Sequence, residues 1–286
     1  MLQAVNVTFG YGERTVLDDV SFDVPAAGFV GIIGPNGSGK TTLLRLLAGT
    51  RKPQRGAVTM EGRALSSLPR LALARRMAVV PQETHLAFEY TVLEVALMGR
   101  YPHLGPFAIE GPADTAIARE ALASTGTLSL EHRAFSTLSG GEKQRVIIAS
   151  ALAQIWSVGP WVRRAGGVAS GDGREIAASA SVVLLDEPTA ALDLKYQIDI
   201  GLLLRELHDR HGLTIVLSTH DLNFAATLCD TLVMLKDGRV LGSGPLGDVL
   251  TPDNVRRLYD VEADVTIHPR TGHLTVVPLR TAGGRQ

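Results

Sequence analysis

One nine-residue segment near the start of the chain constrains its fold more than any other part of the sequence. The segment fits G-x-x-x-x-G-K-[ST], the pattern of a phosphate-binding P-loop, and reads Gly34-Pro35-Asn36-Gly37-Ser38-Gly39-Lys40-Thr41-Thr42. A short apolar run at residues 29–33 precedes it, and a helical pattern at residues 42–48 follows it. A glycine-rich turn without a ligand is the alternative, and the flanking strand and helix argue against it.

The residues of this loop predict a definite chemistry. Its glycines allow backbone N–H groups to turn inward around a phosphate, and the following helix adds partial positive charge at its N-terminus. Lys40 is expected to reach the β- and γ-phosphates of a nucleotide, and the Thr41 hydroxyl is expected to ligate Mg²⁺. Gly49 is placed to end the helix in a left-handed cap.

Length and charge set the class of protein. The 286 residues suit one α/β domain with an appendage, or two small domains. The net charge of −1 gives no electrostatic case for binding nucleic acid or anionic lipid. The single cysteine, Cys229, rules out an intramolecular disulfide. Residues 1–6 show no pattern of a signal peptide, so we expect a soluble protein.

Alternating apolar and polar residues before the P-loop predict two antiparallel, half-buried strands within residues 3–25. The apolar positions are Val5, Val7, Phe9, Val20, Phe22 and Val24. Tyr11 lies between two glycines in the expected connecting loop. The residue pattern leaves two roles open for this tyrosine: stacking on an adenine ring, or packing on its own sheet.

After the P-loop, residues 77–82 form an apolar run that ends at Gln82. A glutamine at the carboxyl end of a strand in a parallel-type sheet points toward a nucleotide crevice, where it could ligate Mg²⁺ or orient water. A capping or surface role is the alternative. The next region, 85–149, carries helical patterns at 92–98 and 114–124 and no clear strand, so we predict a helical subdomain inserted into the sheet domain.

The end of this helical region has the sequence of a capped helix start. Ser139 is a plausible N-cap, and the pair Gly140-Gly141 before Glu142 exposes backbone N–H groups. The pattern predicts a second anion site that has no lysine of its own. A plain helix cap explains the same residues.

Two later strands each end in polar residues. The apolar run 182–185 leads into Asp186, which suits a contact to Mg²⁺ through water, and Glu187, which suits a general base. The run 214–219 leads into His220, which could hydrogen-bond a γ-phosphate or the attacking water. His208 and His211 are expected to be solvated on a helix and not to form a metal pair.

The C-terminal part of the sequence predicts two hairpins. Asp237-Gly238 between the apolar runs 231–235 and 239–241 is a strong hairpin signal. A second hairpin is expected from the segments 264–269 and 273–278.

Taken together, these motifs resemble the ATP-binding subunit of ABC transporters over residues 2–244. The resemblance implies an α/β P-loop cassette with a mostly parallel sheet core and an antiparallel N-terminal sheet. The implied core is 2–84 and 150–244, the helical subdomain is 85–149, and 245–286 is a C-terminal extension. It also implies roles for Tyr11 in adenine stacking, residues 138–142 as signature motif, Asp193 in the D-loop and His220 as switch histidine.

The same resemblance implies an assembly. Two subunits would pack head to tail, with each ATP between one subunit's P-loop and the other's residues Ser139–Glu142. The dimer would bind two membrane permease subunits at the cytoplasmic face of the inner membrane, and work indirectly with a substrate-binding protein, without nucleic acid.

A finer resemblance concerns the cargo. Residues 91–95, 99–103 and 255–261 with the tail hairpin resemble importers of iron-siderophores, haem and cobalamin. The insertion at 155–181, between the signature helix and the strand that ends at Asp186, is similar to that of haem importers but longer. Alternatives are siderophore or cobalamin import, a non-transport ABC ATPase, and a regulator without turnover. Glu187 and His220 argue against the last.

Overall fold

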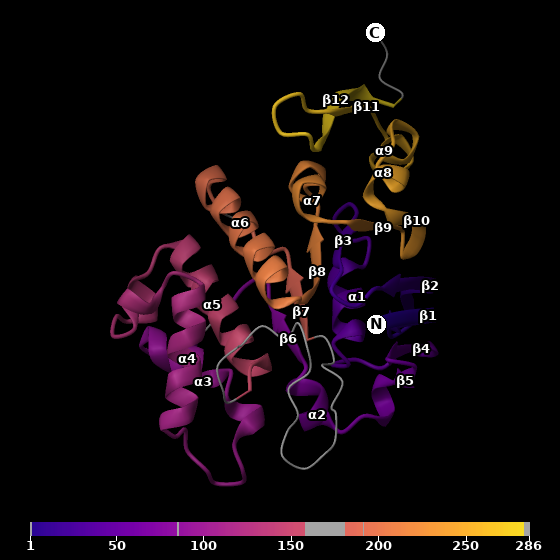
Figure 1. The fold of residues 1–286 in the computed structure, drawn as a ribbon. Helices are drawn as coiled ribbons and strands as arrows, with labels where there is room; N and C mark the ends of the chain where they lie inside the picture. Colours follow the sequence, from indigo (N-terminus) through magenta and orange to yellow (C-terminus); the bar gives the residue numbers. More distant parts are fainter. Residues whose placement is uncertain (1, 85, 158–180, 191, 283–286) are drawn as a thin grey trace. The chain divides into compact units, whose positions relative to one another are not determined.

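The computed structural model describes residues 2–84, 86–157, 181–190 and 192–282. The chain divides into two compact units (Figure 1). Unit 1 consists of Met1–Leu68, Leu184–Pro188 and Ile215–Gln286, and unit 2 consists of Pro69–Val183 and Thr189–Thr214. The boundaries predicted from the sequence stay a prediction.

The first sheet of unit 1 is antiparallel, as predicted, with the strand order β2-β1-β4-β5. Its strands are β1 (Leu2–Tyr11), β2 (Arg14–Val24), β4 (Arg55–Met60) and β5 (Arg63–Ala64). Tyr11 was expected in the loop, but it is the last residue of β1 and pairs with Arg14. Gly12 makes this tight turn possible because it adopts the left-handed conformation, with φ 59°.

The second sheet carries the phosphate loop. Its strands in unit 1 follow the order β10-β9-β3-β8-β7. They are β3 (Phe29–Ile33), β7 (Val182–Asp186), β8 (Thr214–Thr219), β9 (Thr231–Lys236) and β10 (Arg239–Pro245). β3 runs parallel to both β8 and β9, and every residue of β3, β7 and β8 is buried. Strands buried on both faces explain the continuous apolar runs in the sequence.

The hairpin between β9 and β10 confirms the Asp-Gly prediction. Both turn residues have positive φ, 49° at Asp237 and 75° at Gly238, as a type I′ turn requires. The Gly238 N–H donates to the Ser38 carbonyl oxygen, 3.2 Å away. This turn therefore contacts the phosphate loop directly.

The helices of unit 1 and its C-terminal hairpin surround these sheets. They are α1 (Lys40–Leu47), η1 (Leu65–Ser67), α7 (Leu222–Leu228), α8 (Leu246–Val249) and α9 (Pro252–Tyr259), with β11 (Val261–Ile267) and β12 (Leu274–Thr281). Gly49, with φ 67°, follows α1 as predicted. α9 packs against β9 and β11, and β12 packs against α7 (Figure 1). The tail hairpin is therefore confirmed, and it is docked on the unit that carries the phosphate loop.

Unit 2 is mainly helical. Its elements are α2 (Arg70–Ala74), β6 (Met77–Val80), α3 (Val92–Met98), η2 (Tyr101–His103), α4 (Pro112–Ser124), η3 (Leu128–Leu130), η4 (Phe135–Thr137), α5 (Gly140–Ile155) and α6 (Leu194–His211). Helices α3, α4 and α5 pack on one another. Both predicted helices of the 85–149 region are present, and α4 begins at Pro112 because proline suits the first helical position.

A buried arginine joins these three helices. Arg100, only 1% exposed, follows α3 and forms an ion pair with Asp114 of α4 at 3.0 Å. Its guanidinium also donates to the carbonyl oxygens of Ala153 and Trp156 at the end of α5. A buried arginine is stabilised when its charge is paired and its planar group of donors is hydrogen-bonded, and Arg100 meets both conditions.

The two histidines of α6 are not solvated, so that prediction is wrong. His208 is buried, and its Nδ1 lies 2.9 Å from the Leu213 carbonyl oxygen. The His211 ring lies against Trp156, with 5.3 Å between ring centroids. Burial lowers the pKa of His211. The sequence pattern did not indicate these contacts, because they depend on Leu213 and Trp156 of unit 2, which lie outside the helix.

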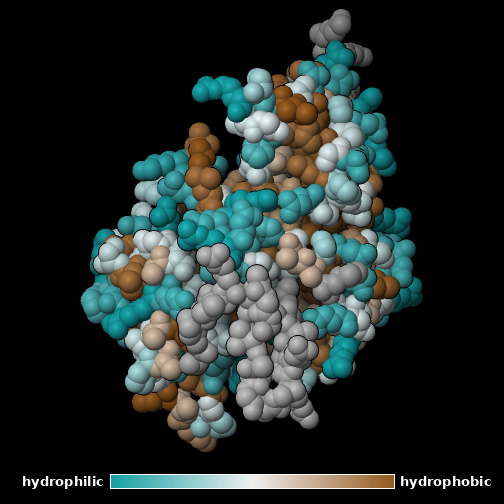
Figure 2. Space-filling model, viewed as in Figure 1, coloured by the Kyte–Doolittle hydropathy of each residue, from teal (hydrophilic) through white to brown (hydrophobic). Residues whose placement is uncertain are grey.

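The predicted 155–181 insertion lies largely outside the described residues, since only its ends are placed. In the parts of the chain that the structure describes, no helix combines the length and the apolar character needed to cross a membrane. Figure 2 shows hydrophobic side chains at the N-terminal end of α6. Leu194, Ile198 and Leu202 of that helix are each more than half exposed.

Candidate active site

The phosphate loop connects β3 to α1 in unit 1. Gly37 and Gly39 have φ values of 80° and 106°, which allow the loop to turn its N–H groups inward. A Cβ atom at position 34 would collide with the Leu235 carbonyl oxygen, so only glycine fits there. Two of its glycines thus have the left-handed conformation, and Gly34 is needed for close packing against β9, which the sequence pattern did not indicate.

Lys40 is the first residue of α1 and is 5% exposed. Its Nζ donates to the carbonyl oxygens of Gly34 and Pro35, at 2.9 and 3.2 Å. The cation thus lies in the hollow of its own loop. The Ser38 hydroxyl is buried in the same loop and has no hydrogen-bond partner among the described residues. A buried hydroxyl beside a lysine fits an anion such as phosphate, because it would otherwise stay unsatisfied.

The carboxyl end of β7 delivers two acids to this loop. Asp186, buried at the end of the strand, accepts a hydrogen bond from the Thr41 hydroxyl at 3.2 Å. It accepts a second from the Ser218 hydroxyl of β8 at 2.6 Å. Hydroxyl and carboxylate oxygens placed together are the donor set that Mg²⁺ prefers. The arrangement fits the metal site predicted for Thr41 and Asp186.

Glu187 is held between two cationic or potentially cationic side chains. Its Oε1 lies 3.5 Å from Lys40 Nζ, and its Oε2 lies 3.3 Å from His220 Nδ1. Its backbone has φ 45°, in the left-handed region that side chains other than glycine rarely adopt. The Glu187 N–H donates to the carbonyl and the hydroxyl oxygens of Ser218, both at 3.1 Å, which holds this conformation. Strain of this kind gathers at functional positions.

His220 follows β8 and is 58% exposed, so one side of this group of residues is open to solvent. The structure therefore brings together residues of three segments that are far apart in the sequence: Lys40 and Thr41, Asp186 and Glu187, and His220. A positive charge, two carboxylates and an imidazole beside a phosphate loop can bind a nucleotide's phosphates and activate water. These are the parts needed for phosphoryl transfer to water.

Tyr11 lies at the edge of the same unit. Its ring packs edge-on against Phe9, with 5.1 Å between centroids. Hydrogen bonding to Thr42 lowers the pKa of the Tyr11 phenol, against the opposing effect of burial. The ring thus packs on its own sheet, as one of the two roles left open by the sequence requires, and adenine stacking stays a prediction.

The predicted signature residues lie in unit 2, at the start of α5. Ser139 is the N-cap and forms a capping box with Glu142: the Glu142 N–H donates to its hydroxyl at 3.3 Å, and the Ser139 N–H donates to the Glu142 carboxylate at 2.8 Å. The bond from the Ser139 backbone lowers the pKa of Glu142. A Cβ atom at Gly141 would collide with the Tyr196 ring, so this glycine has a packing reason that sequence reasoning missed.

Gln82 and Asp193 also belong to unit 2. Gln82 follows β6 with an exposed side chain. Asp193 is the N-cap position of α6, exposed, with no capping bond from its side chain. The roles predicted for both residues stay predictions.

Sequence reasoning missed two residues of unit 1 that contact this group. Ser218 bonds Asp186 through its side chain and Glu187 through both its oxygens. The signal was available, because a serine interrupts an otherwise apolar strand next to the strand that ends in acids. Tyr259 donates to the His220 carbonyl oxygen at 3.2 Å. It lies within the segment 255–261 that carries the importer resemblance, but nothing in that segment indicated a contact with His220.

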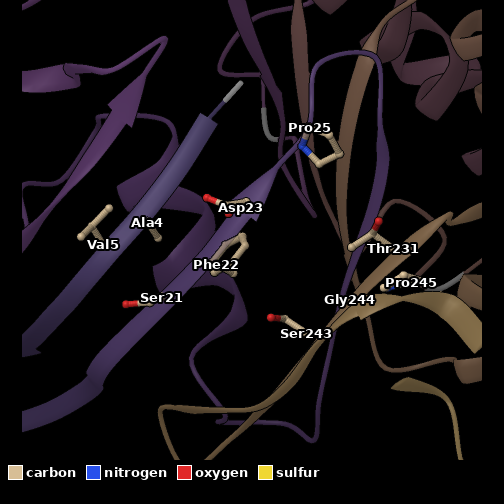
Figure 3. Close-up of a pocket in the computed structure, with 10 residues that line it drawn as sticks. All are labelled: Ala4, Val5, Ser21, Phe22, Asp23, Pro25, Thr231, Ser243, Gly244 and Pro245. Carbon is tan, nitrogen blue, oxygen red and sulfur yellow. The ribbon is translucent and has the colours of Figure 1, made fainter. Parts of the chain in front are cut away.

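A separate hollow of about 620 Å³ lies between the antiparallel sheet and β10 in unit 1 (Figure 3). None of the predicted site residues lines it. Ser21 accepts a hydrogen bond from the Asn6 N–H, and Asp23 accepts one from the Gln3 side chain, so these two polar side chains are already used within the sheet. We assign it no ligand.

This fold and site define a P-loop nucleotide-binding cassette built to hydrolyse a nucleoside triphosphate. The family model described as ABC transporter matches residues 17–158. The chain is 41% identical to the hemin import ATP-binding protein HmuV of Gloeobacter violaceus, covering 99% of this chain and 95% of that protein. It belongs to the ATP-binding subunits of the ABC transporter family, the class that hydrolyses ATP.

A second relative is named for import of a different cargo. The cobalamin import ATP-binding protein BtuD of Halobacterium salinarum is 40% identical over 92% of this chain. The chain spans only 60% of the length of that relative.

Solved structures agree with the fold. A metal-chelate type ABC transporter in an inward-facing conformation matches with a TM-score of 0.78 and 28% identity, covering 97% of this chain and 96% of that one. The ATP-binding cassette MJ0796, solved bound to ADP and Pi, matches with a TM-score of 0.67 and 30% identity, covering 86% of this chain and 99% of that one. The predicted α/β cassette fold is confirmed.

Proposed function

We propose that this chain is the ATP-hydrolysing subunit that powers import of haem through a membrane permease. The observation that carries the proposal is the identity to HmuV over almost the whole length of both proteins. The grouping of Lys40, Asp186 and Glu187 at one phosphate loop supports the ATPase part of it.

In this proposal each residue of the site has one task. Lys40 exchanges its bonds to the loop carbonyls for bonds to the β- and γ-phosphates, joined by the Ser38 hydroxyl. Glu187 orients the attacking water and accepts its proton, while His220 holds the other oxygen of that carboxylate. Thr41 and Asp186, with Gln82 as a further proposed ligand, would hold Mg²⁺. The metal ion, when bound, neutralises charge on the phosphates.

The proposed assembly has two copies of this chain packed head to tail. Residues 139–142 of one copy, together with Asp193 of the same copy, would complete the nucleotide site of the other. ATP would favour the closed dimer and hydrolysis the open one, which is a population shift driven by the ligand. Through two permease subunits the dimer would be held at the cytoplasmic face of the inner membrane, where a substrate-binding protein on the other side delivers the cargo.

Cobalamin import is the second candidate, favoured by the identity to BtuD. An iron-siderophore is a related possibility within the same importer group. All three cargoes leave the ATPase site unchanged, because this subunit is not expected to touch the cargo.

The test is uptake by cells that lack this subunit. Labelled haem, a ferric siderophore and cobalamin are supplied in parallel, and the full-length wild-type chain or its Glu187→Gln variant is returned on a plasmid. Loss of haem uptake alone, restored by the wild-type chain and not by the variant, is the expected result. Selective loss of another cargo would replace haem in the proposal, and unchanged uptake of all three would overturn the transport role.

A further inference from the structure

A side chain of the C-terminal extension contacts the candidate active site. Tyr259 is the last residue of α9 and is half-buried. Its hydroxyl donates to the carbonyl oxygen of His220 at 3.2 Å. The Gly34 backbone, at the start of the phosphate loop, has a smaller opposing effect and lowers the pKa of this phenol. The hydroxyl therefore connects the end of α9 to the backbone of His220.

The surroundings of Tyr259 keep its hydroxyl protonated, so that it can donate a hydrogen bond. Burial raises the pKa of Tyr259 to about 12, and the negative charges of Asp221 and Glu187 act in the same direction. The phenol therefore keeps its proton at every pH at which the protein would work. The protonated phenol can therefore donate to the His220 carbonyl oxygen.

Hydrogen bonds on either side of Tyr259 attach the end of helix α9 to strand β9. Lys236, the last residue of β9, donates through Nζ to the Arg257 carbonyl oxygen at 2.6 Å and to the Asp260 carboxylate at 3.0 Å. These two bonds flank Tyr259 on both sides in sequence. Val255 and Leu258 of the same helix are buried. The phenol is thus presented by a rigid element, which precise positioning requires.

The C-terminal extension also contacts the segment that carries His220 through its hairpin. α7 begins immediately after His220 and Asp221, and its residue Asn223 makes two bonds to the backbone of Val276 in β12. Asn223 accepts from the Val276 N–H at 2.8 Å and donates to its carbonyl oxygen at 3.2 Å. The segment with His220 is therefore held between α9 and the tail hairpin.

We propose that Tyr259 is a positioning residue for ATP hydrolysis, acting by holding the His220 backbone at a fixed place beside the phosphate loop. His220 in turn contacts Glu187, so a displaced carbonyl at position 220 would move the imidazole away from the candidate base. The C-terminal extension is then a working part of the catalytic apparatus. This inference rests on the ATPase part of the proposed function and is independent of the cargo.

The test compares full-length wild-type protein with Tyr259→Phe, which removes only the hydroxyl. We expect kcat for ATP hydrolysis to fall about tenfold, while KM, the affinity for ADP and the thermal midpoint stay within experimental error of the wild type. Tyr101→Phe, at a 59% exposed phenol in unit 2, is the matched control and should change none of these. A wild-type kcat in Tyr259→Phe would overturn the inference, and so would a loss of kcat that only follows a lowered midpoint.

A double-mutant cycle separates action through His220 from a general effect. In a chain that already carries His220→Ala, the Tyr259→Phe change is expected to cost no further activity, because the imidazole that it positions is absent. If the losses of kcat from the two single substitutions multiplied in the double variant, Tyr259 would act independently of the His220 side chain. If wild-type protein itself does not hydrolyse ATP, the proposed function fails, and that outcome differs from both results above.

Discussion

Substituting Glu187 separates nucleotide binding from hydrolysis. Glu187→Gln keeps the length and the conformation of the side chain but removes the charge that polarises water. We expect ATP affinity to stay the same, kcat to fall by about 10² to 10⁴, and a dimer to accumulate with ATP in size-exclusion chromatography. Glu206→Gln, in an exposed ion pair of α6, is the control. Near-normal turnover in Glu187→Gln would remove Glu187 from the mechanism.

Lys40 is expected to govern binding instead. Its amine already lies within the loop, where it donates to two carbonyl oxygens, so its loss removes the positive charge that the proposal assigns to the phosphates. Lys40→Ala should lower ATP affinity by at least tenfold, measured by titration calorimetry. Lys52→Ala, at an exposed position of unit 1, should bind like the wild type. Unchanged ATP affinity in Lys40→Ala would contradict the P-loop assignment.

At the scale of elements, Arg100 holds α3, α4 and α5 together. Arg100→Met leaves the Asp114 carboxylate and two carbonyl oxygens without their donor. Breaking a buried ion pair costs about 3 to 5 kcal/mol, so we expect the thermal midpoint of unfolding to fall by roughly 10 °C. Arg119→Met removes an exposed arginine paired with Glu131 and should shift the midpoint by less than about 2 °C. Equal shifts in the two variants would refute this role for Arg100.

The elements also show what a sequence can predict. The strands and helices that carry the site have strong local signals, such as the apolar run of β3, the Asp237-Gly238 turn and the capping box at Ser139. Contacts between segments that are distant in the sequence have no such local signal. Ser218 behind Asp186 and Tyr259 behind His220 depend on which strands become neighbours, and Gly141 depends on a ring fifty-five residues later in the chain. Periodicity and motifs carry no information on such pairs.

For the molecule as a whole, we predict that stability falls on acidification. Burial is the main cause that lowers the pKa of His211 and of His103 in the folded state, so the unfolded chain binds protons more readily. The stabilisation is therefore present above pH 6.5, the ordinary value for histidine, and is lost as the pH falls through the lowered pKa values. His211→Phe keeps an aromatic ring beside Trp156 and should flatten the dependence of the thermal midpoint on pH between 5 and 8. An unchanged slope would contradict the assignment to His211.

The parallel pairing of β3 has a consequence for synthesis of the chain. β3 leaves the ribosome before both of its neighbours, because β8 and β9 begin roughly 180 or more residues later. At about 5 to 20 residues per second, an apolar strand with two open edges waits for at least roughly 10 s before either partner exists. Such edges invite pairing with other chains. We therefore expect the yield of folded protein to depend on chaperones and growth temperature more strongly than its final stability suggests.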